Sequence, residues 1–166
     1  MSDKDNDKNI IQVPNKLKER AGDGGELPTL ALKEAQMFMA NNDIDFKPMA
    51  TSHLKEIDTH FVVLKEAKTK AEKEFAMAKI IENIMQIKAH GGMFHYQIMS
   101  DIANIVLQLL EVTTDYNAAL YQIIEAHNNS IRIIIKRNIS GDGGMQGKEI
   151  TDELNKAIKR YQTKYK

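Results

Sequence analysis

Two amphipathic helical patterns on either side of a glycine pair constrain this chain more than any other feature. The residues from Ile84 to Glu111 read IMQIKAHGGMFHYQIMSDIANIVLQLLE. On both sides of Gly91 and Gly92, apolar residues recur at the three- and four-residue spacing of one helical face. These apolar residues are Met77, Ile80, Ile81, Ile84 and Ile87 upstream, and Ile98, Ile102, Ile105, Val106 and Leu109 downstream. Because two such helices joined by a tight turn must pack side by side, the sequence predicts a helical hairpin at the centre of the fold.

The composition extends this prediction to the whole chain. The sequence has 166 residues, of which 42% are hydrophobic and 28% charged, with only 3 prolines and no tryptophan. It is rich in unbranched residues, which lose little rotamer freedom in a helix. A chain of this length can bury one continuous core. We therefore predict an all-α fold, an antiparallel bundle.

Helix boundaries follow from the periodicity and from breaker residues. Residues 1–26 are polar or glycine-rich for most of their length, and we expect a flexible N-terminal arm there, followed by a bundle domain over residues 27–166. Pro48 suits the first turn of a helix, and Thr113 or Thr114 is the expected N-cap of the fifth helix. The predicted helices span residues 30–41, 49–68, 69–90, 96–112, 115–138 and 148–161.

Charge and residue usage exclude several classes of function. The 23 basic and 23 acidic residues cancel, so a nucleic-acid or anionic-membrane partner is not expected. No cysteine is present, and His53 and His60 lack the spacing and the third ligand of a zinc site. No apolar run is long enough to span a membrane. We expect no cofactor, no metal and a cytoplasmic location.

Three segments resemble a known family in their order and spacing. They are IIQVPNKLKERAG at 10–22, GMFHYQIMSDIANIVLQLLE at 92–111 and EAHNNSIRIIIKRNI at 125–139. Together they are similar to bacterial histidine-phosphotransfer (Hpt) domains, in particular to a stand-alone alphaproteobacterial type. The resemblance implies a four-helix core, here with the N-terminal arm and an extra C-terminal helix. It also implies a role in two-component phosphorelay signalling, with a response-regulator receiver domain and a histidine kinase as partners.

The family motif is His-x-x-Lys-Gly followed by a glycine turn and an aromatic residue. This chain departs from the motif at the position of the phosphoacceptor histidine. Lys88 matches the motif lysine, and the phosphoacceptor histidine falls on Met85. A thioether offers no nucleophile of the kind that phosphoryl relay needs. The resemblance therefore implies a degenerate protein that docks receiver domains without reacting. The docking residues would be Met85, Lys88, Gly91 and Phe94.

Two alternatives remain open. In the first, the chain is an active phosphotransfer protein that uses His90, which follows Met85 by five positions and lies about 140° further around an ideal helix. A histidine near a helix C-terminus, which favours the helix dipole, is the simpler interpretation of His90. In the second, the chain is a structural helical assembly protein, since a fold does not fix a function. His95 is expected to be a packed or hydrogen-bonded turn residue, and both a monomer and a homodimer are compatible with the sequence.

Overall fold

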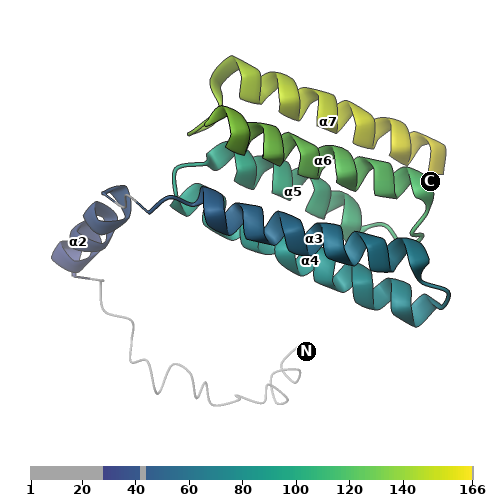
Figure 1. Cartoon of the computed structure of the whole chain (residues 1–166). Coiled ribbons are helices and arrows are strands. Elements are labelled where there is room, and N and C mark those ends of the chain that lie inside the picture. Colours follow the sequence, from purple (N-terminus) through teal and green to yellow (C-terminus); the bar gives the residue numbers. More distant parts are fainter. Residues whose placement is uncertain (1–27, 42–43, 166) are drawn as a thin grey trace, which may run out of the picture. The chain divides into compact units, whose positions relative to one another are not determined.

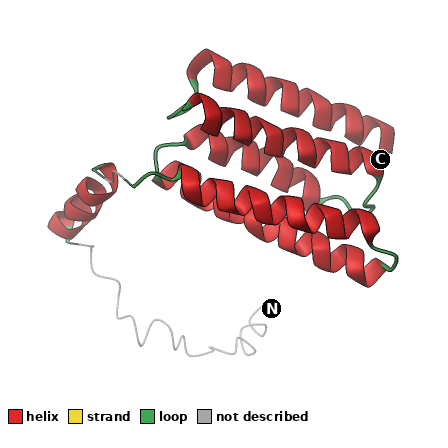
Figure 2. Ribbon diagram, in the orientation of Figure 1, coloured by secondary structure: helices red, strands yellow, loops and turns green. Residues whose placement is uncertain are grey.

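The computed structural model describes residues 28–41 and 44–165, and within these residues it contains six helices and no strand. The predicted all-α class is confirmed (Figure 1, Figure 2). The chain divides into two units between Asn41 and Asn42. The predicted arm, residues 1–26, lies outside the described residues. No described helix is both long enough and apolar enough to cross a membrane.

The six helices agree with the six predicted ones. Their bounds are α2, Thr29–Ala40; α3, Lys47–Glu66; α4, Lys70–Met93; α5, Gln97–Glu111; α6, Ala118–Arg137; and α7, Gly144–Tyr165. Helix α2 belongs to the first unit, and α3 to α7 belong to the second.

Helices α3 to α6 form the four-helix core of the second unit. Helix α4 packs against α3 on one side and α5 on the other, and α6 closes the bundle by contacting α5 and α3. Helix α7 is the extra C-terminal helix and packs on α5 and α6. In Figure 1 these five helices run alongside one another.

The core consists of the apolar faces that the periodicity indicates. Along α3, Leu54, Ile57 and Leu64 are each at most 1% exposed, and α4, α5 and α6 contribute further isoleucines to the same cluster. Those isoleucines are Ile80, Ile84, Ile87, Ile98, Ile102, Ile123, Ile124, Ile131 and Ile134. One continuous core therefore joins all four helices, as the length of the chain predicted.

The turn between α4 and α5 depends on the absence of a side chain at Gly91. A Cβ atom there would lie 2.9 Å from the backbone nitrogen of Ser100 and 3.1 Å from the carbonyl oxygen of Tyr96. The Gly91 carbonyl accepts a hydrogen bond of 2.7 Å from the Tyr96 amide. His95, with φ of 64°, supplies the left-handed residue of the turn. The glycine thus lets the start of α5 lie directly against the end of α4.

Helix starts follow local capping chemistry. Helix α4 begins with a capping box in which the Thr69 hydroxyl accepts from the Glu72 amide, while the Glu72 carboxylate accepts from the Thr69 amide. The predicted threonine N-cap of the fifth helix is wrong. Asn117 caps α6 by accepting a 3.0 Å hydrogen bond from the Leu120 amide. Thr113 instead donates its hydroxyl proton to the Leu109 carbonyl at the end of α5.

Candidate docking groove between α4 and α5

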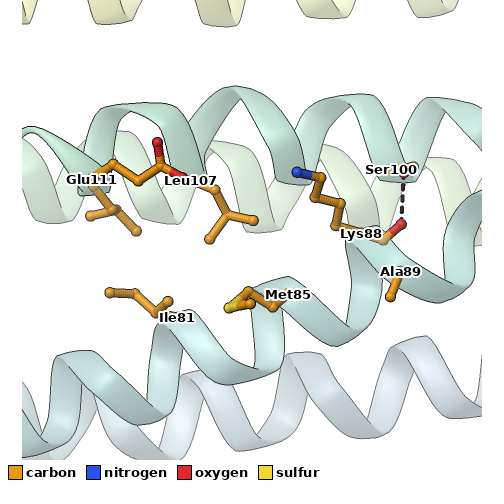
Figure 3. A pocket seen from close by; sticks show the side chains of 8 residues that line it. Ile81, Met85, Lys88, Ala89, Ser100, Leu107 and Glu111 are labelled. Carbon is orange, nitrogen blue, oxygen red and sulfur yellow. Dashed lines mark hydrogen bonds between the residues drawn. The ribbon is translucent and has the colours of Figure 1, made fainter. Parts of the chain in front are cut away.

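An open groove of about 500 Å³ runs between α4 and α5. Its surface is mainly apolar, and in Figure 3 Ile81 and Met85 of α4 face Leu107 of α5 across it. From α4 the lining residues are Ile81, Met85, Lys88 and Ala89, and from α5 they are Ser100, Leu107, Leu110 and Glu111.

Two charged side chains line this mainly apolar groove. Lys88 of α4 and Glu111 of α5 form no ion pair with any other described residue. The backbone of Lys88 is fixed, because its carbonyl accepts a 2.7 Å hydrogen bond from the Ser100 hydroxyl, drawn as a dashed line in Figure 3. The groove therefore presents an apolar surface with one ammonium and one carboxylate that no described side chain neutralises.

Met85 is the one methionine that lines this groove. Its side chain is 55% exposed, whereas Met77 and Met99 of the same hairpin are fully buried. A methionine that only filled space in the core would be covered like the latter two. Flexible, polarizable thioethers on a surface adapt well to protein partners. The position of Met85 is thus suited to non-covalent contact.

The structure separates the four predicted docking residues into two groups. Met85 and Lys88 both line the groove. Gly91 is buried in the hairpin turn, and Phe94 is only 9% exposed, stacked on Phe46 with a ring-centre distance of 5.3 Å. Gly91 and Phe94 therefore support the end of the hairpin and lie beneath the surface that a partner would meet.

His90 lies elsewhere on α4, toward α3. Its half-buried ring lies 6.1 Å from the ring of Phe46 and 6.4 Å from that of His53, between ring centres. The Nδ1 atom of His90 is buried and has no hydrogen-bond partner among the described residues. If Nε2 were the nucleophile, its lone pair would have to be free, which places the ring proton on Nδ1. That proton would have no acceptor, so the surroundings of His90 do not favour phosphoryl transfer.

Two further histidines, His53 and His95, lie outside the groove lining. His53 Nδ1 lies 2.9 Å from Asn83 Oδ1, and the Asn83 amide nitrogen donates to the Lys79 carbonyl. That second bond orients the amide, so His53 carries its proton on Nδ1. His95 is a turn residue as predicted, but its side chain is exposed. Among the described residues no three His, Cys, Asp or Glu side chains are placed to hold a metal ion.

His127 is the fully buried histidine of α6. Its Nδ1–H donates a 2.7 Å hydrogen bond to the Ile123 carbonyl, and Nε2 has no partner among the described residues. Burial lowers the pKa of His127, and the hydrogen bond to the carbonyl opposes that shift only in part. His127 is therefore a core residue whose ring is neutral near pH 7.

The α5 wall of the groove was not predicted from the sequence. Leu107 and Leu110 lie beside the predicted stripe of α5, and both are buried residues that line the groove. The available signal was the run from Val106 to Leu110, which places apolar side chains over more of the helix circumference than one core face needs.

Comparison of the chain with models of known families, with curated proteins and with solved structures finds no match.

Proposed function

We propose that this chain is a degenerate phosphorelay protein that docks response-regulator receiver domains through the α4–α5 groove and does not accept a phosphoryl group. The observation that carries the proposal is the position of Met85. This residue takes the place that the family resemblance gives to the phosphoacceptor, and it stands 55% exposed at an apolar groove of about 500 Å³.

The chemistry at Met85 supports docking without transfer. A thioether cannot be phosphorylated in the manner of an imidazole, because phosphoryl relay needs a nitrogen that is nucleophilic near neutral pH and leaves again readily. An exposed thioether beside Ile81 and Leu107 instead adds apolar contact area. Such a surface binds the same kind of partner as an active phosphotransfer protein does, but it transfers no phosphoryl group.

Lys88 supplies the electrostatic part of the proposal. Receiver domains carry the phosphoryl group on an aspartate, as the resemblance implies, and Lys88 is a cation three residues from Met85 on the same helix. Its ammonium forms no ion pair with another described residue. A complementary charge at the edge of an interface raises the association rate and the specificity for acidic partners.

The experiment is to titrate a panel of purified receiver domains against the full chain by calorimetry. Met85→Asp and Lys88→Glu are the groove variants. Met145→Asp, at a residue of α7 that is 90% exposed and outside the groove, is the matched control. We expect at least one receiver to bind, with about 30-fold weaker binding for Met85→Asp, the loss that a central interface residue typically causes.

Two results would contradict the proposal. The first is that no receiver in the panel binds. The second is that Met145→Asp weakens binding as much as Met85→Asp does, which would place the contact outside the groove. Acid-labile labelling of the wild type by a phosphoramidate, lost in His90→Ala, would instead identify an active phosphotransfer protein.

A further inference from the structure

All the sulfur atoms of this chain are methionine thioethers. The sequence contains 9 methionines and no cysteine. Met85 is the one methionine among the residues that line the α4–α5 groove, and more than half of its side chain is exposed. Met77 and Met99 are fully buried nearby. A small oxidant in solution therefore meets the Met85 sulfur at the groove, while the core sulfurs are covered.

We propose that Met85 is a site of reversible oxidation, and that its sulfoxide weakens docking at the groove. The inference rests on the proposed function for its consequence, though the modification itself does not depend on a partner. The oxidant is a hydroperoxide. One of its oxygens forms a bond to the Met85 sulfur as the O–O bond breaks, and the other oxygen leaves as water or an alcohol after taking up the proton. The sulfur loses two electrons and the peroxide gains them.

The consequence follows from the surroundings of Met85. Oxidation converts a flexible apolar side chain into a polar one and can be reversed by methionine sulfoxide reductases. Around Met85 the groove is formed mainly by Ile81, Ala89 and Leu107, which offer no side-chain donor. A partner that covers the sulfoxide oxygen would leave it without a hydrogen bond, an arrangement that weakens binding about tenfold or more.

Lys88 provides the nearest alternative donor and leads to the same result. Its ammonium lies on the same helix, three residues after Met85, at the spacing that brings side chains together. The Ser100 hydroxyl already donates to the Lys88 carbonyl. If the Lys88 ammonium turns to the sulfoxide, the groove loses the cation that faces an acidic partner. Both responses therefore oppose docking.

Other exposed methionines serve as internal controls. Met145 is 90% exposed and Met93 is 44% exposed, and neither lines the groove. Their oxidation should leave the groove surface unchanged. The inference is thus specific to position 85, and a single substitution can isolate it.

The test treats the full chain and Met85→Leu with hydrogen peroxide and maps each methionine by peptide mass. Leucine keeps an apolar side chain of similar volume that cannot be oxidised. Binding of a receiver domain and of the anionic dye 8-anilinonaphthalene-1-sulfonate is measured before oxidation, after oxidation and after treatment with methionine sulfoxide reductases. The dye reports on the apolar groove even if no receiver binds.

We expect Met85 and Met145 to be oxidised well before Met77 and Met99. In the wild type, binding at the groove should fall about tenfold and recover after reduction, while Met85→Leu binds equally before and after peroxide. Oxidation of Met85 as slow as that of Met77 overturns the inference. An equal loss of binding in Met85→Leu overturns it too, since the effect would then come from another methionine. Unchanged binding of both dye and receiver after complete oxidation of Met85 also overturns the inference.

Discussion

The buried histidine of α6 makes the stability of the bundle depend on pH. His127 is 0% exposed, its Nδ1–H is committed to the Ile123 carbonyl, and Nε2 has no partner among the described residues. Protonation would place a positive charge on a ring that is fully buried. Burial accordingly lowers the pKa of His127 below its ordinary value of 6.5.

The sign of the effect follows from proton binding. As the pH falls below the ordinary pKa of 6.5, the unfolded chain binds a proton at this histidine more readily than the folded chain, in which the pKa is lower. The free energy of unfolding therefore falls as the pH falls through this value, with a limiting slope of about 1.4 kcal/mol per pH unit. By about pH 5.5 the loss from this one group reaches at most about 1.4 kcal/mol relative to neutral pH.

The assay is urea unfolding of the wild type and His127→Leu at a series of pH values between about 5 and 8. The difference between the two stability curves isolates His127, because other titrating groups contribute equally to both proteins. We expect the wild type to lose stability relative to His127→Leu as the pH falls below 6.5. His95→Asn, an exposed control that keeps a residue suited to positive φ, should follow the wild-type curve. Parallel curves for the wild type and His127→Leu would refute the reasoning.

Two further predictions concern the hairpin that builds the groove. Gly91→Ala should lower the free energy of unfolding by about 1–3 kcal/mol, because its Cβ would lie 2.9 Å from the Ser100 backbone nitrogen; an unchanged urea midpoint would show that α5 can shift freely. Thr69→Ala removes the capping box of α4 and should cost about 1 kcal/mol in the same assay, whereas Thr163→Ala, near the end of α7, should have a smaller effect; equal losses would contradict the capping role.

Most of the fold was predictable because periodicity and burial agree along this chain. The stripes through Ile57, Ile84 and Ile102 form the core that their spacing predicts. The predicted helix boundaries were wrong where the backbone conformation of a turn determines the start of the helix. Helix α7 begins at Gly144, four residues before the predicted start, because Gly141, Gly143 and Gly144 take positive φ values and complete the turn within a shorter segment. The Asp142 carboxylate then accepts a hydrogen bond from the Gly144 amide at the helix start.

The candidate site was predictable only in part. The family motif indicated Met85 and Lys88, and both line the groove. It also indicated Gly91 and Phe94, whose burial follows from how tightly the turn packs against Ser100 and Phe46. A one-dimensional motif does not distinguish a residue that meets a partner from one that supports the turn beneath it. That distinction needs the three-dimensional packing of α3 against the end of α4.

We propose that Met85, at the position that the family resemblance gives to the phosphoacceptor, lies on a surface that docks receiver domains. The most direct test incubates a receiver domain phosphorylated with a phosphoramidate with the wild type and with Met85→His, and reads acid-labile phosphate on each by intact mass. The account predicts no phosphate on the wild type and transfer to Met85→His, because docking would present the new imidazole to the receiver aspartate. Phosphate on the wild type, or none on Met85→His despite measurable binding, would contradict it.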